Sequence, residues 1–126
     1  PKPCRKEPFV ELAGQLNLPK TAVLCLNGPE ELPEELLDDP PGFNWFSVLD
    51  EDFNFIVATP TEQRRLTSLR MAVEELDDVI RTLIDSLGWD PGDIFFFGYG
   101  QGGTVALDLL LDPPTDRRPT ASFSSA

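Results

Sequence analysis

A glycine-rich turn at residues 98–103 is the segment whose residue types and spacing could support chemistry. It follows the apolar run 94–97, precedes a helical pattern, and reads Gly98, Tyr99, Gly100, Gln101, Gly102, Gly103. A strand that turns sharply through glycines into a helix brings backbone N–H groups and the positive helix end to the carboxyl edge of a sheet. Ligands bind at that edge in open α/β sheets, so we expect any functional site of this chain at the turn.

Three interpretations of the turn are open. Gly98, Gly100 and Gly103 fit the dinucleotide pattern G-x-G-x-x-G, although no acidic ribose ligand ends the next strand candidate. In a related alternative, the N–H groups of Gln101 to Gly103 would form a nest for an anion. The turn also fits a nucleophile elbow, G-x-S-x-G, with glycine at its centre. In the third interpretation the turn is structural, and Gly100 is glycine because an elbow residue has a positive φ.

Composition excludes several kinds of site. The 126 residues include no histidine, which rules out a histidine base, a Ser-His-Asp triad within the chain and histidine metal ligands. Cys4 and Cys25 have neither the number nor the spacing of a disulfide framework or zinc site, so we expect no metal or cofactor. The two cysteines are compatible with a reducing compartment or an organelle interior, and the sequence specifies no compartment.

The charge of the chain limits its partners. A formal net charge of −12 repels phosphate backbones and anionic lipid, so we expect no nucleic-acid partner. Residues 30–52 carry nine acidic side chains and no basic one. They are read as a solvated acidic segment or, alternatively, as a site for a cation or a basic partner. No apolar run approaches the roughly 18 to 20 residues of a membrane span.

Strand and helix patterns alternate along the chain. Helical patterns are expected near residues 9–16, over 62–87, where apolar residues recur every three or four positions, and from the glycine turn to about Leu111. The strand candidates are residues 21–26, 53–58, 94–97 and a last run from Thr120 to Ser125. This order predicts an α/β fold with a mostly parallel sheet of about four strands and flanking helices. We expect an N-terminal arm at 1–19 and one domain at 20–126.

The glycine turn resembles the G-F-S-Q-G-G elbow of the phospholipase/carboxylesterase group of α/β hydrolases, which includes the acyl-protein thioesterases. The order of elements also resembles that family: a buried strand before a His-Gly pair, a long helix, a proline-containing turn and the elbow strand. The resemblance spans about residues 20 to 126 and roughly the first half of the family fold. It implies the strand order 53–58, 21–26, 94–97, 120–125, with the last strand at an edge.

The sequence departs from the family at each position that the resemblance makes catalytic. Gly100 stands where the family has its nucleophilic serine, and Asn27, before Gly28, replaces the histidine of the His-Gly pair. Pro29 falls where a loop residue donates its N–H to the oxyanion, and proline has no N–H to donate. The backbone of Gln101 is the oxyanion donor that could remain. The acid and histidine of the family would lie beyond residue 126.

These departures predict a catalytically inactive α/β-hydrolase-like subunit or interaction module, part of a larger protein assembly. Protein subunits would cover the sheet edge at Thr120–Ser125, and the acidic surface would suit basic neighbours. One alternative is a carboxylesterase or thioesterase-type serine hydrolase, present as a fragment or an inactivated variant. A second alternative is a nucleotide- or anion-binding module that uses the glycine turn.

Overall fold

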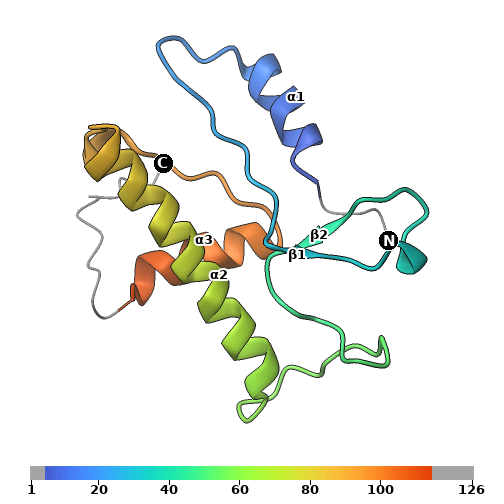
Figure 1. Ribbon diagram of the computed structural model, residues 1–126. Coiled ribbons are helices and arrows are strands. Elements are labelled where there is room, and N and C mark those ends of the chain that lie inside the picture. Colours follow the sequence, from blue (N-terminus) through green and yellow to red (C-terminus); the bar gives the residue numbers. More distant parts are fainter. Residues whose placement is uncertain (1–4, 115–126) are drawn as a thin grey trace. The chain divides into compact units, whose positions relative to one another are not determined.

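The protein is represented by a computed structural model that describes residues 5–114. These residues form α-helices, short 3-10 and π turns and one small sheet (Figure 1). The chain divides into two compact units, Pro1–Phe46 and Ser47–Ala126, and each unit is described by itself.

The first unit contains one helix and one sheet. Helix α1 (Glu7–Leu16) confirms the predicted short helix, and it ends where Asn17 takes a left-handed conformation with φ 45°. None of its residues is buried. Strands β1 (Glu30–Glu31) and β2 (Phe43–Asn44) pair in antiparallel fashion, with Glu30 opposite Asn44. The acidic segment contains a short 3-10 turn, η1 (Glu34–Leu36).

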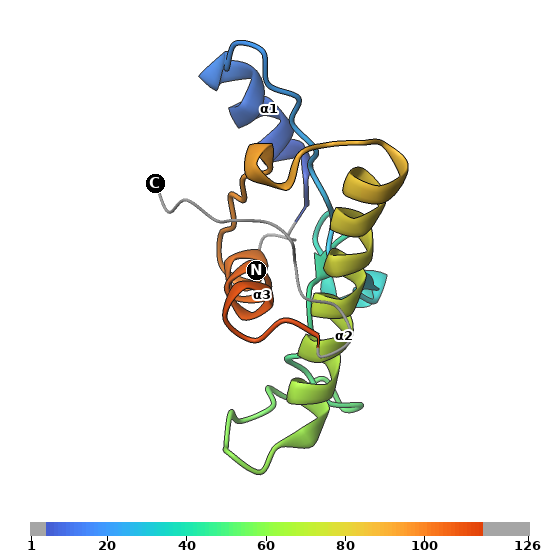
Figure 2. The ribbon, with the colours of Figure 1, turned by 90° about the vertical axis from the view of Figure 1, so that its left-hand side faces the viewer.

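Two helices dominate the second unit and confirm the two predicted there. Helix α2 (Gln63–Arg81) continues into a π turn, η2 (Thr82–Ser86), and the chain leaves it at Gly88 with φ 73°. Helix α3 (Gln101–Leu111) packs against α2, and the two lie side by side in Figure 2. The apolar contact between them forms most of the core of this unit, because nearly all of its buried apolar side chains come from the two helices: Ala72, Val73, Leu76 and Ile80 from α2, and Val105, Ala106 and Leu109 from α3.

One charged group lies inside this core. Asp77 is 1% exposed, and the Arg81 Nε donates to its Oδ2 over 2.8 Å from the next turn of α2. A buried carboxylate is tolerated when it is paired and hydrogen-bonded. The pair explains why an acidic residue can occupy the apolar face of α2.

The predicted four-stranded parallel sheet is not formed in the described part of the chain. Residues 21–26 and 94–97 belong to no strand, and 53–58 contributes an isolated antiparallel bridge between Leu49 and Phe55. The sheet present among residues 5–114 is the two-stranded antiparallel one, and the fourth run, 120–125, lies outside the described residues. An apolar run becomes a strand when its backbone pairs with a neighbouring strand. Pattern alone does not supply that neighbour, so the parallel sheet stays a prediction.

Candidate functional site

The glycine turn begins helix α3 in a conformation that few residues adopt. Gly100 is the N-cap of α3, with φ 56° and ψ −126°. This combination is strained for residues with a Cβ atom, and few of them adopt it. The Gly100 carbonyl oxygen accepts hydrogen bonds from Thr104 N at 3.1 Å and from Thr104 Oγ1 at 3.3 Å. The chain therefore turns sharply at Gly100 and enters the helix at once, as an elbow does.

The two outer glycines of the turn touch each other. A Cβ atom built on Gly98 would lie 2.6 Å from the Gly103 Cα, and one on Gly103 would lie 3.1 Å from the Gly98 carbonyl oxygen. Atoms do not approach so closely without moving something. Glycine at both positions is explained by the close packing of residue 98 on the first turn of α3.

The central position differs from its neighbours because it has room. A Cβ atom on Gly100 would meet nothing within 4 Å, so backbone strain disfavours a side chain at this position and contact does not. Tyr99, the preceding residue, is exposed. The turn thus offers an open position above the start of α3, and its own residue there has no side-chain oxygen or sulfur to attack a carbonyl.

Arg70 of α2 holds the far end of α3. Its Nη1 donates to Asp108 Oδ2 at 3.2 Å and to the Asp112 carbonyl oxygen at 2.9 Å, and its Nη2 lies 3.1 Å from Asp112 Oδ2. The guanidinium bridges the last turn of α3 and the residue that caps it. This bridge adds polar contacts to the apolar packing of α3 on α2.

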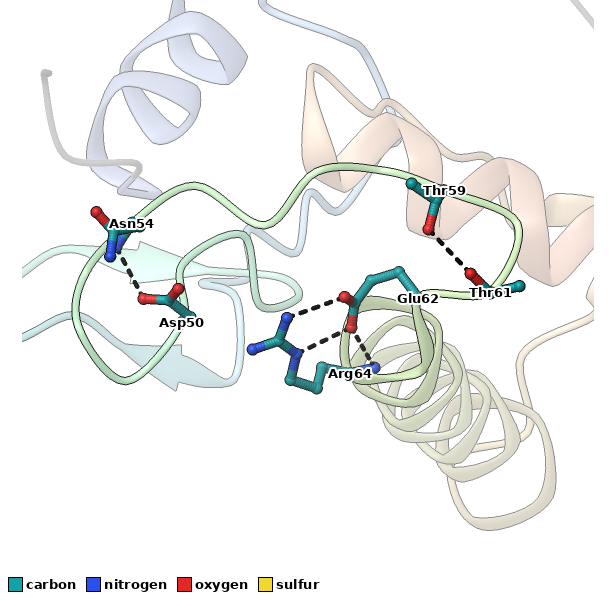
Figure 3. Close-up of polar contacts among 6 residues, drawn as sticks. All are labelled: Asp50, Asn54, Thr59, Thr61, Glu62 and Arg64. Atoms are coloured by element: carbon teal, nitrogen blue, oxygen red, sulfur yellow. Dashed lines mark hydrogen bonds and ion pairs between the residues drawn. The ribbon is translucent and has the colours of Figure 1, made fainter.

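The start of α2 has a strong cap. The Glu62 carboxylate accepts hydrogen bonds from Arg64 Nε, Arg64 Nη2 and the Arg64 backbone N–H, each at 2.9 Å (Figure 3). The side-chain bonds first, and then the backbone bond, lower the pKa of Glu62 from 4.5 to about 2. The cap is a structural feature at the start of α2.

The loop at residues 27–29 lies in the first unit and serves as a structural joint there. The Asn27 Oδ1 accepts a hydrogen bond from the Lys6 backbone N–H at 2.8 Å, directly before α1. A Cβ atom on Gly28 would lie 2.2 Å from the Asn44 carbonyl oxygen in β2. Asn27 therefore binds the backbone directly before α1, and Gly28 lets the backbone of β2 lie close to the loop. Pro29 has no N–H to donate.

The structure thus places the predicted site residues in two groups. Gly98, Tyr99, Gly100, Gln101 and Gly102 share one turn of the second unit, and the loop 27–29 belongs to the first. Across residues 5–114, no three His, Cys, Asp or Glu side chains gather as a metal site would need. Within the same residues no helix has the length and apolar character to cross a membrane.

Sequence reasoning missed three contacts at these sites. They are the bond between Lys6 and Asn27, the approach of Gly28 to β2, and the Arg70 bridge. Each joins residues far apart in the chain, and Arg70 is 38 positions from Asp108 and 42 from Asp112. One partial signal existed for the bridge. Asp108 and Asp112 are four residues apart at the end of the predicted helix, and two carboxylates at this spacing suit a basic partner whose identity the sequence does not give.

Comparison with known proteins identifies one family and two relatives. The family model described as Phospholipase/Carboxylesterase matches residues 8–126. The chain is 29% identical over 97 residues to the uncharacterized hydrolase UM10204 of Mycosarcoma maydis, covering 77% of this chain and 33% of that protein. It is 34% identical over 99 residues to the uncharacterized hydrolase C9G1.08c of Schizosaccharomyces pombe, covering 79% of this chain and 38% of that protein. No solved structure matches.

The chain therefore belongs to the phospholipase/carboxylesterase family of α/β hydrolases. The match confirms the resemblance and the α/β class. The chain spans about a third of the length of the two curated relatives it matches.

Proposed function

We propose that this chain keeps the elbow of its family as a structural turn, does not hydrolyse esters, and acts as an interaction module in a larger assembly. One observation carries the proposal: Gly100 holds the elbow backbone with φ 56° and has no side chain. The family places its nucleophilic serine there. Without that hydroxyl the covalent route to an acyl-enzyme has no attacking atom.

Two further features support the absence of catalysis. The chain contains no histidine, so no imidazole of its own can take a proton from a nucleophile. Pro29 cannot donate a backbone hydrogen bond to an oxyanion, and loss of one such donor reduces transition-state stabilisation by about 2.7 to 4 kcal/mol. Asn27 accepts a bond from the Lys6 N–H and Gly28 lies against Asn44, and both contacts fit a structural role for this loop.

The exposed aromatic side chains before the elbow support the interaction role. Phe95, Phe97 and Tyr99 are 69%, 75% and 79% exposed, whereas Ile94 and Phe96, which alternate with the first two, are half-buried. A contiguous apolar strip of this kind marks a surface that another polypeptide covers. We expect protein outside these 126 residues to cover both this strip and the predicted sheet edge at Thr120–Ser125.

The first experiment tests the nucleophile. The chain is incubated with a fluorophosphonate, and its intact mass is recorded. We expect an unmodified mass, because no activated hydroxyl or thiol stands at the elbow. A stoichiometric adduct mapped to residues 98–103 would contradict the proposal.

A second experiment tests the uncovered surface. Charge repulsion between molecules acts over only about 8 Å at physiological salt, whereas a fully buried large apolar side chain contributes about 1.5 to 3 kcal/mol. We therefore expect the isolated chain to associate or to be poorly soluble in sedimentation experiments. A soluble monomer that unfolds cooperatively would show that its own residues cover the strip.

One observation favours an alternative function. Because a Cβ atom at Gly100 would meet nothing within 4 Å, the elbow has room for a serine. A serine hydrolase inactivated by replacement of its nucleophile would have this geometry. Ester turnover by the Gly100→Ser variant of a full-length protein would favour that alternative. The nucleotide- or anion-binding alternative stays a prediction, and the contact of Gly98 with Gly103 has a packing explanation that needs no ligand.

A further inference from the structure

A small hairpin in the second unit, residues 48–56, presents an unusual tip. Its arms are joined by hydrogen bonds from Ile56 N to the Val48 carbonyl oxygen and from Asp50 N to the Asn54 carbonyl oxygen, both 2.9 Å long. Between these bonds Leu49 and Phe55 form an antiparallel bridge. The tip, residues 50–54, is stabilised by Asp50 Oδ1, which accepts from the backbone N–H groups of Asp52 and Asn54 at 2.9 Å. Figure 3 shows the bond between Asp50 and Asn54.

Phe53 occupies a strained position in this tip. Its φ is 62°, in the left-handed region that glycine and asparagine favour and that a bulky residue rarely adopts. Phe53 is 52% exposed, so its ring keeps a large apolar surface in contact with solvent. Backbone strain of this kind is found where a side chain is presented for function.

Two more apolar side chains extend the exposed surface. Phe55 and Val57 are 79% and 74% exposed, whereas Ile56 between them is 6% exposed and points into the unit. Phe55 and Val57 thus share the outer face of the hairpin arm. We call Phe53, Phe55 and Val57 the hairpin patch.

Negative charge borders the hairpin patch. Glu51 and Asp52 are exposed at the tip, and neither forms an ion pair with a residue in the part of the chain that the structure describes. The pKa of Arg64 is raised first by the hydrogen bonds and charge of Glu62 and then by the charges of Asp50 and Glu51, so this basic side chain feels the negative charge of the tip. Its guanidinium is held by Glu62, so the rim of the patch keeps an excess of carboxylates.

We propose that the hairpin patch docks a basic protein segment, in which apolar side chains that cover Phe53 and Phe55 are flanked by lysine or arginine. Exposed aromatic rings with a polar rim have the make-up of interface hot spots, and the carboxylates of Glu51 and Asp52 select a cationic partner. The same carboxylates repel anionic lipid and nucleic acid. This inference deepens the proposed interaction role and rests on it.

The test uses a labelled synthetic peptide in which lysine alternates with valine, followed by fluorescence anisotropy with the whole chain. We expect saturable binding that weakens at least about tenfold in Phe53→Gly, in Phe55→Ser and in the Glu51→Lys, Asp52→Lys double variant. A control peptide in which serine replaces valine should bind at least about tenfold more weakly than the valine peptide.

Melting temperatures separate docking from folding. Phe53→Gly relieves the positive φ, so its melting temperature should equal or exceed that of the unaltered chain. A clear fall would identify the ring as structural and overturn the inference at Phe53. Phe55→Ser, which removes a ring that is more exposed still, repeats the test without a change in backbone conformation.

Several results would overturn the inference. They are absence of peptide binding, equal binding by the serine peptide, unchanged binding by the variants, and binding of anionic vesicles at the patch. Self-association that Phe53→Gly abolishes would make a second copy of the chain the occupant. Ester turnover would contradict the proposed function, but it would not bear on peptide binding at the hairpin patch. The proposal on catalysis and the proposal on docking can therefore fail independently.

Discussion

Gly98 and Gly103 pack backbone to backbone where the chain turns into α3, so close that a Cβ atom on Gly98 would lie 2.6 Å from the Gly103 Cα. The contact holds the elbow shape independently of the residue at its centre. Gly100, which lies between them, has open space and no side chain. In this turn, packing therefore accounts for the glycines at positions 98 and 103, and positive φ accounts for the glycine at position 100.

Gly98→Ala should destabilise the second unit. The added methyl has to displace backbone atoms of Gly103, and such overpacking typically costs about 1 to 3 kcal/mol. Gly103→Ala is the matched control, since its methyl meets the Gly98 carbonyl oxygen at 3.1 Å and improves the helix propensity of α3. Urea unfolding should show a larger loss for Gly98→Ala than for Gly103→Ala. The reverse order would mean that the turn relaxes freely.

Gly100→Ser should be folded but inactive. Forcing a non-glycine residue into φ 56° costs on the order of 1 to 3 kcal/mol, with no steric clash to add to it. The new hydroxyl has no histidine beside it, and a serine without an adjacent base is a weak nucleophile. Rapid mixing with a p-nitrophenyl ester should show no burst of product. A burst would reveal that another group acts as base.

The Arg70 bridge should contribute modestly to stability. Its side chain is 41% exposed, and ion pairs of this exposure contribute about 0 to 1 kcal/mol. Arg70→Met should lower the free energy of unfolding by about that amount, and less in high salt. In a double-mutant cycle with Asp108→Asn the two losses should be less than additive. Strict additivity would show that the two residues do not interact.

The Glu62 cap should make stability depend on acid pH. Because bonds from Arg64 lower the pKa of Glu62 from 4.5 to about 2, the folded state favours the carboxylate. Its stabilising contribution is complete above the unfolded pKa of 4.5 and is lost as the pH falls toward 2. Glu62→Gln should flatten the acid limb of the stability curve measured by urea unfolding between about pH 6 and pH 2. Identical limbs in both proteins would contradict the cap.

The helices and the glycine turn were predictable from the sequence because their determinants are local. The spacing of Val73, Leu76 and Ile80 marks the buried face of α2, and Gly88 marks its end. The strands were not confirmed, since pairing depends on chain far away in sequence. Phe95 and Phe97 have a strand pattern and still lie exposed in the described residues. The hydrogen bond from the Lys6 N–H to Asn27 could not be predicted for the same reason, because it joins residues 21 positions apart.

The central claim is that this member of a hydrolase family does not hydrolyse esters, and steady-state turnover tests it most directly. The purified chain is incubated with a p-nitrophenyl ester over a range of substrate concentrations, beside a buffer blank and a Gly98→Ala preparation purified in the same way. We expect all three to release p-nitrophenol at the blank rate. Saturable release by the unaltered chain that survives further purification, and that Gly98→Ala reduces, would contradict the account.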